Sequence, residues 1–305
     1  MRSVLRPLAF ALVLVSMIIV GCAGGAPSSE TPPAVASPTA AATSTAGLAA
    51  LVNGQPISTE YYQRQIAQVE AFFVQEGLDL ESGEGQERLA QAYRQVLEQM
   101  IDQELIRQAA AEMGISISDE ELESKIQEII EQSGGQEQFD QSLRDTGTSY
   151  DDFRQMLLDQ LLGEAVFSSV TASISSVAEQ VHARHILLAT REKAEEVLAR
   201  LQGGEDFAFL AREYSEDVSS RERGGDMGIF PRGITPPEIE DKAFSLDVGE
   251  ISGIIESDFG FHIVQVLERG EREIAPEIFE NLRQQTFMQW LMTGRESATI
   301  ERFVE

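Results

Sequence analysis

Hydrophobic residues recur every three or four positions through the first half of the chain, between Ser58 and Val170. This spacing is typical of helices that bury one face. Residues that can cap a helix precede several of these runs, and glycines follow others. The pattern predicts helices from Ser58 to Gly77, from about Gln86 to Met113, from Ser118 to Gly134, from about Gln136 to Thr146 and from Tyr150 to Val170.

The pattern changes to strands in the segment that runs from Val181 to Arg269. Its first residues, VHARHILL, and its last residues, SDFGFHIVQVLER, each form an apolar run that predicts a β-strand. All three histidines of the chain lie in these two strands. Polar side chains inside apolar strands make this segment the first place to look for chemistry.

Shorter elements are predicted near the two ends of this folded region. Apolar residues flank the turn sequence Asn53-Gly54, which predicts a small hairpin or an edge strand over Leu51 to Ile57. A helix that opens at Pro276 precedes a strand within Ala298 to Val304. These last elements are too small for a core of their own. We therefore expect them to pack on the N-terminal helices, with the final strand beside the hairpin and the histidine-containing region as an insertion.

Six short pieces within this segment match the parvulin family of peptidyl-prolyl cis/trans isomerases in the family's order. They are His-Ile-Leu-Leu at 185–188, Tyr-Ser-Glu-Asp at 214–217, Gly-Gly-Asp-Met-Gly at 224–228, Ala-Phe-Ser-Leu at 243–246, Gly-Glu at 249–250 and Phe-Gly-Phe-His-Ile at 259–263. A single short motif is weak, whereas six in order are specific. The segment therefore resembles a parvulin domain, which implies a small antiparallel sheet flanked by helices.

The resemblance implies a catalytic set of four residues. His185 and His262 are the paired histidines on neighbouring strands, hydrogen-bonded to each other. Asp217 stands where family members have Cys or Asp, and Ser257 stands at a small hydroxyl position. The implied substrate-binding residues are Met227, Phe230, Thr235, Ile239 and Phe259. Thr235 replaces the family's usual Met and Ile239 its usual Phe, which predicts a shallower proline pocket.

The chemistry of prolyl isomerisation agrees with these residue types. Rotation about an Xaa-Pro bond breaks amide resonance, a barrier of about 20 kcal/mol, and no covalent bond is made or broken. A catalyst needs a dry pocket and groups that favour the twisted amide. We therefore expect no metal and no cofactor.

Other interpretations of the same residues are weaker. Zinc binding by His182 and His185 is disfavoured, because residues three apart on a strand face opposite sides. Ser257 and His262 could suggest a hydrolase, but the chain has no G-x-S-x-G motif. The segment after Leu188 lacks the long basic loop of phosphate-directed parvulins. A non-catalytic holdase with an inactive parvulin-like domain remains the alternative, favoured by Thr235 and Ile239; a structural or adhesion lipoprotein has no supporting motif.

The N-terminal segment has the features of an export signal. Arg2 and Arg6 precede an apolar run that ends in Ile-Val-Gly-Cys, and Cys22 is the only cysteine of the chain. This end resembles a bacterial lipobox, which implies a signal peptide over 1–21 and a lipid anchor on Cys22. An ordinary signal peptide with an incidental cysteine is the alternative. The Ala-, Pro-, Ser- and Thr-rich residues 22–48 predict a disordered linker.

The net charge of the chain limits the kinds of molecule that it can bind. A formal net charge of −28 disfavours nucleic acids and anionic membrane surfaces, so that any membrane attachment must be covalent or inserted. The helical region, 49–177, resembles the N-terminal lobe of SurA-like and PrsA-like extracytoplasmic foldases, which bind non-native polypeptide. We therefore predict an α+β protein with a helical chaperone lobe, an inserted parvulin domain over 178–270 and a C-terminal return over 271–305. The expected partners are unfolded or partly folded exported polypeptides with Xaa-Pro bonds, outside the cytoplasm.

Overall fold

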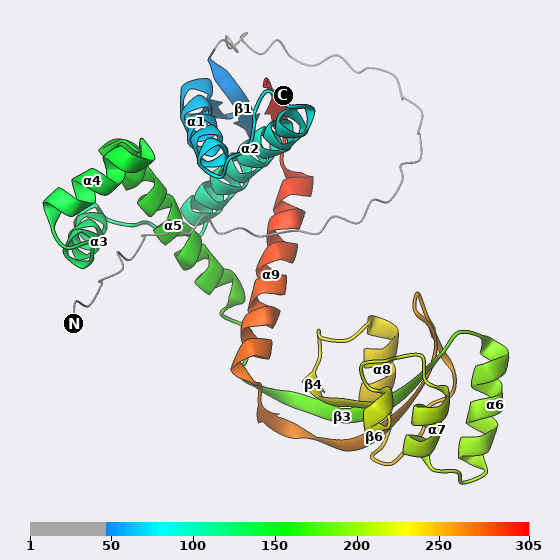
Figure 1. Cartoon of the computed structure of the whole chain (residues 1–305). Helices are drawn as coiled ribbons and strands as arrows, with labels where there is room; N and C mark the ends of the chain where they lie inside the picture. The colour runs from blue at the N-terminus through cyan, green and yellow to red at the C-terminus, as the bar shows by residue number, and fades with distance from the viewer. Residues whose placement is uncertain (1–46, 305) are drawn as a thin grey trace, which may run out of the picture. The chain divides into compact units, whose positions relative to one another are not determined.

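The computed structural model of the chain describes residues 47 to 304 (Figure 1). The predicted signal peptide, Cys22 and most of the predicted linker lie outside the described residues. Within the described part, no helix combines the length and the apolar character that crossing a bilayer requires.

A small sheet joins the two ends of the described chain. It contains β1 (Leu48–Val52), β2 (Gln55–Ser58) and β7 (Ile300–Arg302), in the order β2-β1-β7. The turn between β1 and β2 places Asn53 and Gly54 at positive φ, as a tight hairpin turn requires. Leu51 pairs with Pro56 on one side and with Glu301 on the other. The predicted hairpin and its pairing with the final strand are confirmed.

Helices account for the rest of this N-terminal lobe. They are α1 (Thr59–Gln75), α2 (Gly83–Glu112), α3 (Asp119–Gln132), α4 (Gln136–Thr146), α5 (Tyr150–Thr171) and α9 (Pro276–Ser297). The side chains of Ser58, Ser118 and Ser149 cap α1, α3 and α5 by accepting a hydrogen bond from a backbone N–H of the first turn, as the sequence predicts.

The start of α2 differs from the prediction. The helix begins at Gly83 rather than near Gln86, because Ser82 accepts a hydrogen bond from the N–H of Gly85 and caps it earlier. A Cβ on Gly85 would lie 2.0 Å from the carbonyl oxygen of Asp79. Glycine is therefore needed here for a close backbone approach, although it disfavours helix in sequence-based reasoning.

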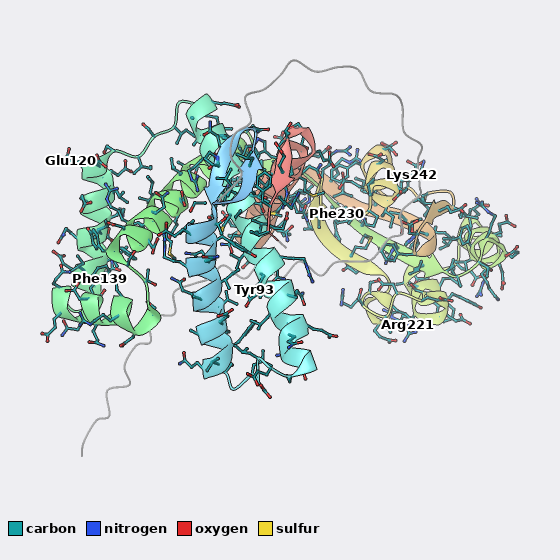
Figure 2. All side chains as sticks on the ribbon, turned by 90° about the horizontal axis from the view of Figure 1, so that it is seen from above. Tyr93, Glu120, Phe139, Arg221, Phe230 and Lys242 are labelled. Carbon is teal, nitrogen blue, oxygen red and sulfur yellow. The ribbon has the colours of Figure 1, made fainter. Side chains whose placement is uncertain are left out.

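Separate apolar clusters hold the lobe together. The small sheet packs on α1, α2 and α9 through residues that include Val52, Ile101 and Leu291. A second cluster joins α3, α4 and α5 around Ile126 and Phe139, the latter labelled in Figure 2. The helices thus bury one face each, as their periodicity predicts.

A second sheet carries the histidines. Its strands are β3 (Val177–Leu188), β4 (Asp226–Pro231), β5 (Ile255–Ser257) and β6 (Gly260–Glu273), in the antiparallel order β4-β3-β6-β5. Four short helical elements accompany it: α6 (Arg191–Gln202), α7 (Phe207–Tyr214), η1 (Arg221–Arg223) and α8 (Pro237–Ser245).

The two faces of this sheet have different apolar cores. On one face Val264 and Val266 pack with Phe230 of β4 and with α8. On the other face Ile186 and Ile263 pack with α6 and α7. Alternate residues of a strand belong to opposite faces, so β3 and β6 supply residues to both cores. The architecture is the small antiparallel sheet flanked by helices that the sequence predicts.

Candidate active site

Two histidine rings lie together on adjacent strands. His185 is on β3 and His262 on β6, and the residue paired with His262 across the strands is Leu187, two positions from His185. The rings stack with centroids 5.5 Å apart and an interplanar angle of 19°, and their Nδ1 atoms are 3.4 Å apart. His185 is 8% exposed and His262 only 2%. The predicted pairing of the two histidines is confirmed.

Each imidazole has a second partner on its outer nitrogen. His185 Nε2 lies 2.7 Å from Oδ2 of Asp217, in the loop after α7. His262 Nε2 lies 2.8 Å from Oγ of Ser257, in β5. The backbone N–H of Phe259 donates to the same Ser257 oxygen at 3.1 Å. The structure therefore places all four predicted catalytic residues in one continuous chain of hydrogen bonds.

The proton positions in this chain follow from its carboxylate end. An ionised Asp217 can only accept, so His185 Nε2 must carry a proton. In a neutral imidazole Nδ1 of His185 is then an acceptor, and Nδ1 of His262 must donate to it. Nε2 of His262 is left as an acceptor for the Ser257 hydroxyl. Every donor in the chain has an acceptor, so both imidazoles are satisfied in their neutral form.

The local electrostatics agree with this assignment. Burial lowers the pKa of His262 to about 4, helped by the neighbouring His185 and opposed by the negative charges of Asp217 and Glu238. Burial would raise the pKa of Asp217, but hydrogen bonds from Ser220, His185 and Ser219 outweigh it and hold that pKa well below its usual range. The site thus contains neutral His262 and ionised Asp217 at neutral pH.

Sequence reasoning missed the two serines that hold the carboxylate. Ser219 donates to Oδ1 of Asp217 from its backbone N–H at 3.0 Å and from its hydroxyl at 2.7 Å. Ser220 donates a short hydrogen bond to Oδ2 and lies 3.2 Å from His185 Nε2. The sequence does carry a signal, because an aspartate followed at two and three positions by serine is typical of a turn closed by its side chain.

The residues predicted to wall a proline pocket differ in accessibility. Phe230 and Ile239 are each 3% exposed and belong to the apolar core on the imidazole face of the sheet. Met227 packs against the same core and is half-buried. Thr235 is also half-buried, and its hydroxyl oxygen is buried without a hydrogen-bond partner among the described residues. Phe230 and Ile239 therefore pack in the core beneath the imidazole rings, and little of their surface is accessible to a substrate.

Phe259 is the most accessible of the predicted pocket residues. It occupies the turn between β5 and β6 and is 71% exposed. Its backbone is fixed by the hydrogen bond to Ser257. The hydrogen bond to Ser257 therefore keeps Phe259 next to the four predicted catalytic residues while its side chain stays exposed to solvent. In this position the side chain can contact a bound polypeptide.

The third histidine belongs to a different environment. His182 lies three positions from His185 and pairs through Nε2 with Oδ1 of Asp226 at 2.8 Å. The same oxygen accepts from the backbone N–H of Gly228. Within residues 47–304 no group of three or more His, Cys, Asp or Glu side chains could hold a metal ion. His182 thus has a structural pairing of its own, as predicted.

The apolar surroundings of the two imidazoles determine how the site can act on a ligand. The Asp217 carboxylate is surrounded by donors and is not available for direct attack. Neutral rings over an apolar floor exclude water and stabilise a weakly polar group better than a strongly polar one. The site is therefore suited to a change of conformation in which the bound group becomes less polar.

Comparisons with known proteins agree with this interpretation. Residues 168–270 match the family described as PPIC-type PPIASE domain, and residues 1–166 match the SurA-like N-terminal domain. The foldase protein PrsA of Caldanaerobacter subterraneus subsp. tengcongensis is 32% identical over 71% of this chain and 72% of its own. PrsA of Oceanobacillus iheyensis is 32% identical over 65% of this chain and 69% of its own.

A crystal structure of the peptidylprolyl isomerase PrsA from Bacillus cereus is similar with a TM-score of 0.45 and 24% identity, covering 83% of this chain and 88% of that one. The family matches cover both the lobe that precedes the histidine sheet and the sheet itself. The chain belongs to the PrsA foldase family and contains a PPIC-type peptidyl-prolyl isomerase domain.

Proposed function

We propose that this protein isomerises Xaa-Pro bonds in exported polypeptides and assists their folding outside the cytoplasm. The observation that carries the proposal is the closed hydrogen-bond chain from Asp217 through His185 and His262 to Ser257. It connects the two imidazoles to a carboxylate and a hydroxyl, beside the apolar core that contains Phe230 and Ile239.

The geometry suggests how the barrier to rotation is lowered. A planar amide is strongly polar, since resonance places negative charge on its oxygen and positive charge on its nitrogen. In the twisted amide this resonance is lost and the group becomes less polar. A site that replaces water by neutral rings and apolar side chains therefore stabilises the twisted amide relative to the planar one. The charge of Asp217, held behind His185, also disfavours negative charge on the carbonyl oxygen.

The N-terminal lobe is proposed to hold the client polypeptide. The end of α1 exposes two large apolar side chains, Phe72 at 53% and Val74 at 59%. Contacts between apolar side chains and a non-native chain need no particular client sequence. The isomerase domain, between β3 and β6, is proposed as an insertion that acts on prolines of a client held by this lobe.

The location outside the cytoplasm is proposed from the N-terminal sequence. A basic start, an apolar run and the only cysteine at position 22 support export followed by lipidation of Cys22. Two acyl chains on such a residue anchor a protein stably. Mass spectrometry of the membrane fraction tests this, since Cys22→Ala removes both the lipid mass and the membrane attachment if the proposal holds.

Exchange NMR tests the isomerase activity directly. A peptide with an Ala-Pro bond is mixed with a catalytic amount of the full chain, and exchange cross-peaks between its cis and trans signals are recorded. We expect exchange on the subsecond timescale, against tens of seconds without catalyst. Absence of cross-peaks with folded protein would overturn the activity. Suppressed aggregation of a proline-free unfolded client separately measures the chaperone function.

A further inference from the structure

The carboxylate of Asp217 accepts hydrogen bonds at four donor contacts. Oδ1 accepts from the backbone N–H and the hydroxyl of Ser219, and Oδ2 accepts from Ser220 Oγ and His185 Nε2. A carboxylate offers about four lone-pair directions. Asp217 therefore has little capacity left for a substrate, and its effect on the reaction must pass through His185.

Only one of the two serines lies on the histidine side of the carboxylate. Ser220 is 2% exposed, shares Oδ2 with His185 and lies 3.2 Å from its Nε2. Ser219 is exposed and contacts only Oδ1. Because two donors meet at Oδ2, the position of the Ser220 hydroxyl fixes where that oxygen points.

The backbone holds Ser220 in place by means of the Gly-Gly motif. The carbonyl of Ser220 accepts from the N–H groups of Arg223 and Gly225, both at 2.9 Å. The N–H of His185 in turn donates to the carbonyl of Gly225 at 2.8 Å. A Cβ on Gly225 would lie 2.2 Å from the His185 carbonyl oxygen. The Gly-Gly motif thus holds the backbone of Ser220 close to β3, next to His185.

We propose that Ser220 is a positioning residue of the isomerase site, in an inference that rests on the proposed function. Its hydroxyl holds Oδ2 of Asp217 in the one orientation that keeps the proton of His185 on Nε2. That tautomer leaves Nδ1 of His185 as the acceptor for His262, which in turn leaves His262 Nε2 as the acceptor for Ser257. Ser220 therefore acts through the orientation of Asp217, whose carboxylate sets the proton arrangement of the chain, and does not touch the substrate.

Two alanine variants of adjacent serines test the proposal in the full chain. Ser220→Ala removes the hydroxyl donor to Oδ2, on the His185 side, and Ser219→Ala removes the hydroxyl donor to Oδ1, where the backbone N–H of Ser219 still donates. We expect kcat/KM for a prolyl peptide to fall about 10-fold in Ser220→Ala, in line with the loss of a hydrogen bond to a charged group. A smaller loss, of about 3-fold, is expected in Ser219→Ala, because Oδ1 keeps its backbone donor.

Readouts other than rate separate positioning from a general loss of structure. Long-range ¹H–¹⁵N NMR of the imidazoles reports which nitrogen of His185 and His262 carries the proton. In the wild type we expect Nε2–H on His185 and Nδ1–H on His262, and in Ser220→Ala a mixture of tautomers. The acid limb of the rate profile is also expected to move to higher pH, since Asp217 loses a donor that lowers its pKa.

The outcomes are distinct. Wild-type tautomers and rate in Ser220→Ala, or an equal loss in Ser219→Ala, would overturn the proposal. If Ser220→Ala does not fold, Ser220→Cys decides, because a thiol is a weaker donor to Oδ2: a mixture of tautomers supports the proposal, and wild-type tautomers with the wild-type rate contradict it. The tautomers are visible in the absence of any turnover, so failure of this proposal is distinguishable from absence of isomerase activity.

Discussion

Two carboxylates of this molecule are held by similar numbers of donors but differ in how their charge is balanced. Asp152, in α5, is 7% exposed and receives three hydrogen-bond contacts of 3.0 to 3.2 Å from the guanidinium of Arg64 in α1. Asp217 receives hydroxyl, backbone and imidazole donors. Among residues 47–304 no lysine or arginine lies within ion-pair distance of Asp217.

The difference distinguishes a structural carboxylate from one that belongs to a site. An ion pair such as that of Asp152 cancels its own field and joins two helices. Neutral donors stabilise the charge of Asp217 but leave its field in place, and this field acts on His262. The ion pair of Asp152 stabilises the fold. The uncompensated charge of Asp217 instead determines which nitrogens of the neighbouring imidazoles carry protons and disfavours negative charge on a bound group.

The largest expected effect comes from acid, through His262. Its pKa is about 4 in the folded chain and about 6.5 in an unfolded one. Between these values only the unfolded chain takes up the proton, so stability falls as pH decreases from 6.5 to 4, by up to roughly 3 kcal/mol. Urea unfolding at pH 7, 5.5 and 4.5 measures this loss.

A variant isolates the contribution of His262 from those of other groups. His262→Asn removes the titrating ring, so its stability is expected to depend less on pH over the same range. An identical pH dependence in wild type and variant would contradict the assignment of a neutral buried imidazole.

The next largest effect concerns the ion pair of the helical lobe. Asp152→Ala leaves Arg64 without its main partner and removes the contact with Ser149, which donates to Asp152 at 2.7 Å. Because the Arg64 side chain is 44% exposed and can turn to solvent, we expect a loss of about 2 kcal/mol rather than the larger cost of a fully buried pair. Thermal unfolding measures it.

Isomerase activity distinguishes Asp152→Ala from a variant in the isomerase site, because Asp152 lies in the helical lobe. The rate per folded molecule of Asp152→Ala should equal that of the wild type, and the exposed neighbour Asp151 is the control, with Asp151→Ala expected within 0.5 kcal/mol of wild type. Wild-type stability of Asp152→Ala would show that the ion pair does not stabilise the lobe.

Smaller changes in stability, of opposite sign to each other, are expected when the half-buried Thr235 and the buried Thr148 are replaced. The Thr235 hydroxyl has no partner among the described residues, whereas that of Thr148 has Gln68 and Thr146. Thr235→Val should therefore raise the free energy of unfolding by about 1 kcal/mol, and Thr148→Val should lower it by a similar amount. Chemical denaturation compares the two. Equal destabilisation by both would show that Thr235 is also satisfied in the folded chain.

The smallest change in stability is expected at Phe259. Because this side chain is 71% exposed, Phe259→Ala should leave the unfolding free energy within 0.5 kcal/mol of wild type. If it contacts the bound peptide, KM should rise about 3-fold through lost apolar contact. Phe209→Ala is the control, since Phe209 is 52% exposed on α7, which packs on the other face of the sheet. An unchanged KM in Phe259→Ala would place Phe259 outside the substrate site.

Much of the fold and the central chain of four residues could be predicted from the sequence. Caps at Ser58, Ser118 and Ser149 are local signals, since the capping atom and the capped N–H are three residues apart. The two histidines, Asp217 and Ser257 come from motifs in a fixed order, and strand pairing then brings them together. Short-range caps and motifs in a fixed order can be recognised from one sequence alone.

Other features depend on contacts between distant segments. The early start of α2 depends on the approach of Gly85 to the Asp79 carbonyl, and the burial of Ser220 depends on the docking of the Gly-Gly turn against His185. The different accessibilities of Phe230 and Phe259 follow from packing in the sheet core and at a turn. Periodicity and residue type do not carry this information.

The most direct test of the account compares two histidine variants by exchange NMR on a prolyl peptide. His262→Ala interrupts the chain between Ser257 and His185, whereas His182→Ala removes a ring of the same chemistry that pairs with Asp226 outside the site. We predict that isomerisation falls at least 10-fold in the folded His262→Ala protein and stays within 2-fold of wild type in His182→Ala. Equal rates for wild type and His262→Ala would contradict catalysis at the imidazole pair.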